Sequence, residues 1–157
     1  MKPFDNLYLI AAVAKFGVIG DSYTPGMLWH CREELKHFKN TTMGSTIVMG
    51  RITAETTGKL PGRDCIVLSR DPNYKLEGFT TMTIDNFLTY AQCNPTVSFM
   101  ICGGGEIYLS LIAYCRIAIV SRMKLEVKGD ITFYVPSEFE KYNVREFSDF
   151  TVNYYSR

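Results

Sequence analysis

A single glutamate interrupts an apolar helix face in the first third of the chain. Residues 29–39 predict one amphipathic helix, in which Cys31, Leu35 and Phe38 recur at i, i+4 and i+7. At about 100° per residue, Glu34 falls within roughly 60° of the centre of that stripe. A buried carboxylate is costly unless something hydrogen-bonds it. We therefore expect Glu34 either to reach out to solvent or to face a pocket that requires an anion.

Two strand-to-helix junctions carry bare glycines. Gly50 and Arg51 follow a strand expected at 46–49, and Gly103-Gly104-Gly105 follows a strand expected at 97–102. Glycine lets a ligand approach the backbone closely, and the N-terminus of the following helix suits a phosphate. At the first junction alone, an ordinary turn with a surface arginine is the favoured interpretation. Neither junction is a GxGxxG or a Walker A motif.

Ser69-Arg70 ends a third expected strand, at 65–69. The carboxyl ends of parallel strands share one edge of the sheet, where ligands of open α/β sheets bind. Two arginines and three such strand ends on one edge suggest an extended, multiply phosphorylated ligand, such as a dinucleotide with a 2′-phosphate.

Other catalytic chemistry is sparse in the sequence. There is no GxSxG elbow, and His30 and His37 fall on or near the polar side of the 29–39 helix. The five cysteines show no CxxC or metal-ligand spacing, so we expect reduced thiols and no metal site. A redox reaction carried by a bound cofactor needs few reactive side chains, which fits this composition.

The elements that must position these residues alternate between strands and helices. We expect strands at 7–14, 46–49, 65–69, 80–83, 97–102 and 116–123, helices at 29–39, 53–57, 84–91 and 106–113, and a long irregular loop at 18–28. This alternation predicts an α/β domain with a mostly parallel central sheet and about four helices. The aromatic segment 138–157 predicts an antiparallel C-terminal edge, with one strand at 142–150 and only a stub at 151–157.

Composition excludes several classes of protein. The 157 residues fit one domain, 1–157, and 46% hydrophobic content indicates a globular fold. The net charge is +1, with no basic stripe, so nucleic acid is not an expected partner. Neither a spanning apolar run nor a signal-peptide pattern occurs, so we expect a cytoplasmic protein that is not in a membrane.

At this point the chain resembles dihydrofolate reductase, over nearly all of residues 7–135. The resemblance rests on motifs in the family's order: 9–14 (LIAAVA), 17–20 (GVIG), Trp29 with Glu34-Leu35 and Phe38-Lys39, 48–53 (VMGRIT), 60–63 (LPGR), 103–108 (GGGEIY) and 129–133 (GDITF). It is closest in type to bacterial, plasmid or phage forms. It implies NADPH-dependent reduction of 7,8-dihydrofolate to tetrahydrofolate, with hydride passing to pterin C6 and a proton, from water, to N5.

The resemblance implies roles in folate binding. Glu34 would hold the pterin and favour N5 protonation, with Trp29 and Tyr108 beside it. Ser121 would hydrogen-bond the carboxylate, and Arg63, near Lys39, would bind the α-carboxylate of the glutamate tail. The remaining pocket walls would be Ile10, Ala11, Leu35, Phe38, Thr57, Leu60 and Cys102.

It also implies a cofactor site. Carbonyls of Ala12 and Ile19 would hold the nicotinamide carboxamide. The loop 18–28 would be a gating lid. The phosphates would meet Gly50, Arg51, Ile52, Thr53, Ser69, Arg70, Gly103, Gly104, Gly105, Glu106 and Ile107, while Gly20 and Met27 complete the cofactor side. The Gly103–Gly104 peptide is expected to be cis.

Some residues depart from the family's pattern. The lid is about two residues longer than in bacterial forms, Cys102 and Thr57 replace aliphatic residues, and the last strand is expected to be short. Antifolates such as trimethoprim and methotrexate would be further ligands, and family habit implies a monomer. Two alternatives stay open: a pyrimidine reductase of riboflavin synthesis, which lacks the Trp29–Lys39 pattern, and a non-catalytic homologue, which would have lost Glu34 and Arg63.

Overall fold

The computed structural model describes residues 2–157. The strands in this range are β1 (Phe4–Val13), β2 (Val18–Gly20), β3 (Thr46–Gly50), β4 (Cys65–Leu68), β5 (Thr80–Met82), β6 (Phe99–Ile101), β7 (Cys115–Met123), β8 (Ile131–Thr132), β9 (Glu140–Glu146) and β10 (Phe150–Ser156). The helices are α1 (Arg32–Thr42), α2 (Arg51–Thr57), α3 (Ile84–Cys93) and α4 (Gly105–Leu111), with short 3₁₀ turns η1 (Lys15–Gly17) and η2 (Ile112–Tyr114).

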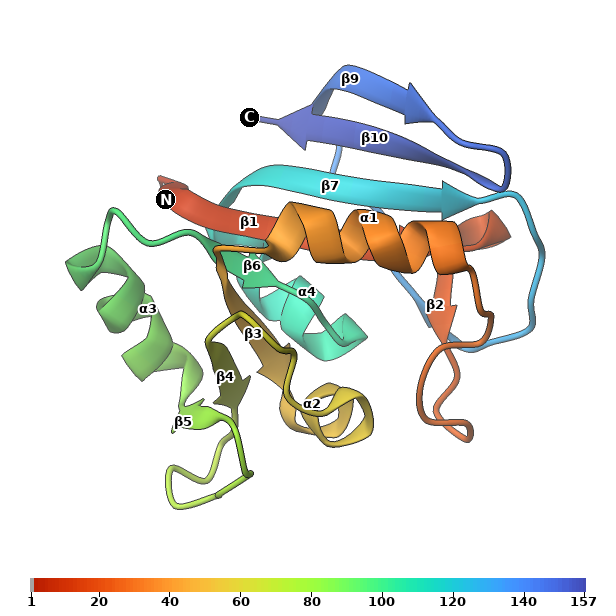
Figure 1. The fold of residues 1–157 in the computed structure, drawn as a ribbon. Coiled ribbons are helices and arrows are strands. Elements are labelled where there is room, and N and C mark those ends of the chain that lie inside the picture. The colour runs from red at the N-terminus through yellow and green to blue at the C-terminus, as the bar shows by residue number, and fades with distance from the viewer. Residues whose placement is uncertain (1) are drawn as a thin grey trace.

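Eight of the strands form one twisted sheet in the order β5-β4-β3-β6-β1-β7-β10-β9 (Figure 1). All pairs from β5 to β7 are parallel, and β10 runs antiparallel to both β7 and β9. The predicted α/β class, with its antiparallel C-terminal edge and four α-helices, is confirmed. Strands β2 and β8 pair separately, so the first three residues of the expected irregular loop are a strand.

Apolar side chains fill both faces of this sheet, which produces two cores. Phe87 of α3 and Leu111 of α4 pack in one, while Ala54 of α2 lies in the other and Phe38 of α1 packs against it. In Figure 1, α1 lies alongside β1 and β7. Strands covered on both faces are continuously apolar, as the 7–14 run predicted.

Helix α1 begins at a different residue from the one predicted, and a different set of its residues is buried. It begins at Arg32, and Cys31 is the extended residue before it. Its buried residues are Glu34, His37 and Thr42, whereas Leu35 is 47% exposed. The predicted Cys31–Leu35–Phe38 stripe was therefore wrong at Leu35, and Cys31 precedes the helix, whereas Cys31 and Phe38 do pack against the core. The placement of His37 on the polar side was also wrong.

The C-terminal hairpin corrects a second prediction. Residues 151–157 are no stub, because all seven residues of β10 pair with β7, from Phe150 opposite Met123 to Ser156 opposite Ile117. The strand expected at 142–150 is instead β9, which ends at Glu146. Phe147 and Phe150 lie at the turn, where their rings stack with centroids 4.4 Å apart. Aromatic residues that resembled strand positions thus close the turn.

Across residues 2–157 no helix is long and apolar enough to cross a membrane. In the same range, no group of three or more His, Cys, Asp or Glu side chains is arranged to hold a metal ion.

Candidate active site

Glu34 lies buried on the first turn of α1, against strand β7. Its side chain does not reach out to solvent, because the residue is only 6% exposed. The Ser121 hydroxyl of β7 donates to Glu34 Oε2 over 3.4 Å. Register places Ser121 beside Ala12, near the end of β1. Of the two outcomes that the sequence left open, the structure has the inward-facing carboxylate.

Burial changes the acidity of Glu34. Loss of hydration raises its pKa from 4.5 to about 7, and the hydrogen bond from Ser121 offsets this only in part. The side chain can therefore be neutral or ionised near physiological pH. A carboxylate in this state is stabilised by a ligand that donates hydrogen bonds or carries positive charge.

Tyr108 lies on α4, the helix that follows β6. In the sheet, β6 and β7, which carries Ser121, flank β1 on opposite sides. Its hydroxyl donates to the Ile10 carbonyl over 2.8 Å, and the residue is 6% exposed. Burial raises the Tyr108 pKa, and the nearby thiol of Cys102 and carboxylate of Glu34 raise it further. The structure thus brings Glu34, Ser121, Ile10, Cys102 and Tyr108 together.

The remaining residues expected to line a folate pocket lie on β1, α1, α2 and the segments next to these helices. Trp29, Phe38 and Leu60 are half-buried and pack against the core beneath α1 and α2. Ala11 is buried in β1, while Leu35, Lys39 and Thr57 are exposed. Burial raises the pKa of the Cys102 thiol, which therefore stays neutral and is no nucleophile.

Arg63 is far more enclosed than a turn arginine, at 8% exposure. Its Nε donates to the Pro61 carbonyl over 3.1 Å, and its Nη1 to the Thr42 hydroxyl over 2.9 Å. The sequence indicated Arg63 but not Thr42. A threonine at the end of a helix carries no sign of a partner 21 residues away.

The two glycine junctions face each other across β3 and β6. Gly50 N donates to Gly103 O over 2.8 Å, and the Gly103–Gly104 peptide is cis, as predicted. A Cβ on Gly50 would lie 2.8 Å from Ile107, and a Cβ on Gly104 would lie 3.1 Å from the Thr53 hydroxyl. Only bare backbone fits here, which agrees with a site for a cofactor's phosphates.

The cations expected to meet phosphates have acidic neighbours. Arg51 lies 3.6 Å from Glu55, whose carboxylate also accepts the Tyr74 hydroxyl, and the Arg70 Nη2 lies 2.5 Å from Glu106 Oε1. All four charged groups are exposed, so each ion pair contributes little and can exchange partners. Ser69 accepts a hydrogen bond from Asp71 N at the same edge, and Ile52 is exposed.

The loop after β2 is held by Asp130, which the sequence did not indicate as a partner. Ser22 N donates to Asp130 Oδ1 over 2.7 Å, and the Ser22 hydroxyl donates to Asp130 Oδ2. These bonds lower the Asp130 pKa. Ile19 and Gly20 precede this contact in β2, and Met27 beyond it is 53% exposed. The loop is thus fixed at one point and open at its tip.

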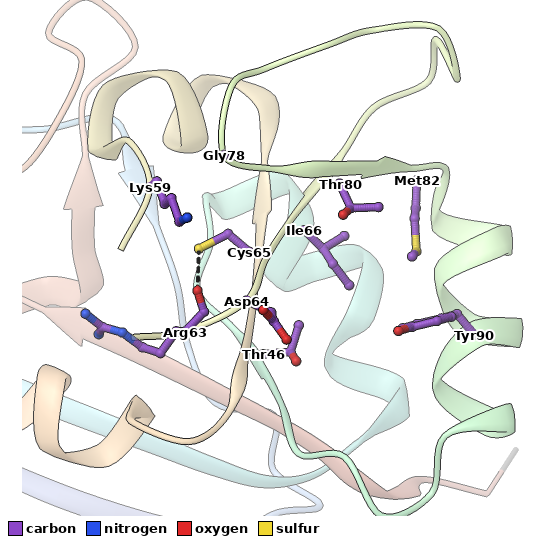
Figure 2. A pocket seen from close by; sticks show the side chains of 10 residues that line it. All are labelled: Thr46, Lys59, Arg63, Asp64, Cys65, Ile66, Gly78, Thr80, Met82 and Tyr90. Carbon is purple, nitrogen blue, oxygen red and sulfur yellow. Dashed lines mark hydrogen bonds between the residues drawn. The ribbon is translucent and has the colours of Figure 1, made fainter. Parts of the chain in front are cut away.

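A cavity of about 210 Å³ lies elsewhere, at the amino ends of β3 and β4 (Figure 2). Thr46, Asp64, Thr80 and Tyr90 are among its lining residues. Glu34 and the glycine junctions belong to the opposite, carboxyl edge of the sheet, so they do not line this cavity. Of the residues expected in the site, Arg63 is the one that lines it.

Comparison with known proteins decides the family. The dihydrofolate reductase family model matches residues 6–156. The chain belongs to the dihydrofolate reductase family. It is therefore an NADPH-dependent oxidoreductase that reduces dihydrofolate to tetrahydrofolate. The match does not favour a pyrimidine reductase of riboflavin synthesis or a non-catalytic homologue.

Similar proteins match most or nearly all of the chain. Dihydrofolate reductase from Mycoplasma genitalium is 37% identical, covering 96% of this chain and 98% of that one. Dihydrofolate reductase type 3 from Salmonella typhimurium is 36% identical over 80% of this chain and 76% of that one. A solved structure of the Enterococcus faecalis dihydrofolate reductase, complexed with NADP(H) and RAB-propyl, superposes with a TM-score of 0.86. It is 28% identical and covers 98% of both chains.

Proposed function

We propose that Glu34 binds and polarises the pterin ring of dihydrofolate. The observation that carries this proposal is a buried carboxylate with Ser121 as its hydrogen-bonding side chain and a pKa near 7. A pterin offers an amino group and a ring nitrogen in the parallel geometry that a carboxylate accepts with both oxygens. The negative charge of Glu34 favours positive charge on the ring, and so protonation at N5.

NADPH, when bound along the glycine junctions, would supply the hydride for pterin C6, and water would provide the proton at N5. The protein's contribution is to align the two rings and exclude bulk water. Tyr108 fixes the Ile10 carbonyl at the floor of the site through its 2.8 Å bond. Trp29 and Leu60 wall the site, and the loop held by Asp130 covers the nicotinamide side. In this proposal Glu34 acts on N5 through the negative charge that it places beside the ring, and water is the direct acid.

The cofactor's phosphates would lie along the glycine junctions. Gly104 and Gly105 leave backbone uncovered for the pyrophosphate, and Thr53 offers a hydroxyl beside them. We assign the 2′-phosphate to Arg51, Ser69 and Arg70, whose exposed ion pairs with acidic neighbours can exchange for phosphate. The carbonyls of Ala12 and Ile19 would receive the carboxamide.

The folate tail would run past Phe38, Leu35 and Lys39 to Arg63. The Arg63 guanidinium is a planar fork of N–H donors, a shape that suits a carboxylate. Its burial makes the positive charge costly without an anion, so substrate binding would offset the cost.

Oxidation of NADPH by dihydrofolate tests the mechanism. Purified protein should lower the near-ultraviolet absorbance of NADPH only when dihydrofolate is present. Glu34→Ala should reduce turnover at least a hundredfold, as expected for loss of a group that stabilises transition-state charge. Affinity for NADPH should stay nearly unchanged. A comparable loss of NADPH affinity would remove Glu34 from the pterin site.

We also propose a monomer that acts in the cytoplasm in one-carbon metabolism and binds antifolates such as trimethoprim or methotrexate. The five free cysteines fit a reducing compartment. Sedimentation at two protein concentrations tests the first point, and inhibition titrations test the last. The trimethoprim titration is the more informative of the two, because Cys102 and Thr57 replace aliphatic residues of the family's pattern.

A further inference from the structure

The C-terminal end of α1 is connected to Arg63 by one hydroxyl. Thr42 is the last residue of α1 and is completely buried. Its Oγ1 donates to the Phe38 carbonyl over 2.8 Å and accepts from Arg63 Nη1 over 2.9 Å. A hydroxyl has one proton and two lone pairs, so the proton goes to Phe38 and a lone pair meets the cation. The direction of both bonds is thereby fixed.

Arg63 keeps donors available after these contacts. Nε is bonded to Pro61 and one proton of Nη1 to Thr42, which leaves three of the five N–H groups. Within the described residues, Nη2 has no hydrogen-bond partner, and it is not among the buried atoms that lack one. Nη2 therefore reaches solvent. Figure 2 shows the guanidinium turned away from Ile66, Thr80 and Tyr90, and Thr42 places it toward α1.

We infer that Thr42 is a positioning residue for the substrate's tail: it holds the Arg63 guanidinium so that its free N–H groups meet the carboxylate. This inference rests on the proposed function, which assigns that carboxylate to Arg63. Arginine has many rotamers, and a group that is already fixed loses less entropy on binding. Loss of the hydroxyl would leave a buried N–H unpartnered or let the guanidinium turn toward another acceptor.

A purely structural role for Thr42 makes a different prediction. The bond to Phe38 is a back-bond to residue i−4, which affects helix stability alone. If the bond to Phe38 were the whole contribution of Thr42, its loss would change the stability of the protein. It would also change the kinetic constants for every substrate by the same factor. The matched control is Thr89→Val, because Thr89 makes the same back-bond to Asp85 at an exposed position of α3, with no arginine on it.

The test compares dihydrofolate with dihydropteroate, which lacks the glutamate tail. Thr42→Val should raise the KM for dihydrofolate roughly tenfold, the effect of one charge-assisted hydrogen bond. It should leave kcat, and both constants for dihydropteroate, within about twofold of the parent values. Thr42→Ser should restore the parent KM, and Thr89→Val should change neither substrate. Equal changes for both substrates, or an unchanged KM for dihydrofolate, would overturn the inference.

Two further variants keep the inference testable: one replaces Thr42→Val if that variant does not fold, and the other shows whether the effect of Thr42 depends on Arg63. Should Thr42→Val not fold, Thr42→Cys takes its place, because its thiol is of similar size and a weak acceptor. In an Arg63→Ala background, Thr42→Val should add nothing to the KM for dihydrofolate, and an additive effect would count against positioning. If Arg63→Ala itself leaves that KM unchanged, the tail assignment in the proposed function fails. If only Thr42→Val leaves it unchanged, the Thr42 inference alone fails.

Discussion

Replacing Glu34 by glutamine should stabilise the protein while it abolishes turnover. The folded state holds the Glu34 proton up to a pKa of about 7, whereas the ordinary value, taken for the unfolded chain, is 4.5. A raised folded pKa stabilises the protein at low pH, and that stabilisation is lost as pH rises from 4.5 through 7. Above pH 7 the folded protein therefore contains an ionised, buried carboxylate. Glutamine removes that charge and keeps the shape.

The magnitude follows from the two pKa values. At about 1.4 kcal/mol per unit, the ionised Glu34 costs about 3 kcal/mol at pH 8. The glutamine amide still needs partners, and only Ser121 is near, so about 1 kcal/mol is lost. Glu34→Gln should thus gain about 2 kcal/mol at pH 8, or roughly 4–8 °C in Tm for a chain of this size. The difference between variant and parent should grow by about 2.5 kcal/mol from pH 5 to pH 8.

Denaturant unfolding at pH 5, 6.5 and 8 measures this directly. Glu33→Gln is the matched control, since Glu33 is an exposed neighbour on the same helix. It should change stability by less than about 0.5 kcal/mol at every pH. A Glu34→Gln difference that is constant across the three pH values would refute the reasoning, because the carboxylate would then carry no pH-dependent cost. Greater stability with lost turnover would mean that the site is strained for its function.

Three other expectations concern the cofactor and the packing of α1. Arg51→Ala should raise the KM for NADPH more than that for NADH; steady-state kinetics showing equal effects would remove its 2′-phosphate role. Gly105→Ala should raise the KM for NADPH several-fold, since the new Cβ would lie 2.8 Å from Ile131. Burial, and then the charge of Arg145, lower the pKa of His37, so protonation favours the unfolded chain and stability falls as pH drops below 6.5. His37→Leu should remove this loss in urea titrations at pH 7.5 and 5.5, and an unchanged pH dependence would contradict it.

Short-range patterns predicted the framework of the site well. Gly50 and the glycines from Gly103 end apolar strands, and parallel strands put their ends on one edge, so the cofactor side could be expected from local sequence. The phase of α1, meaning which of its residues face the core, could not be expected from local sequence. Cys31 matched the period although it precedes the helix, and buried His37 lies beside the rings of Phe147 and Phe150, which are more than a hundred positions away in the sequence.

Contacts between distant polar residues escaped prediction for a related reason. Ser22 and Asp130 are 108 positions apart, and each has the composition of an ordinary loop residue. Their pairing depends on β2 meeting β8, and a two-residue strand leaves almost no periodic signal. The same holds for the C-terminal hairpin, where alternation alone did not place the turn.

The position of β1 in the middle of the sheet has a consequence for synthesis of the chain. Its partners are β6 and β7, which are made in the second half of translation. Strands β3, β4 and β5 can pair with one another earlier, but β3 joins β1 only through β6. A nascent chain on the ribosome therefore exposes the apolar run of β1 for most of its elongation, as a binding site for chaperones. Glu34 gains its strand partner only when β7 emerges.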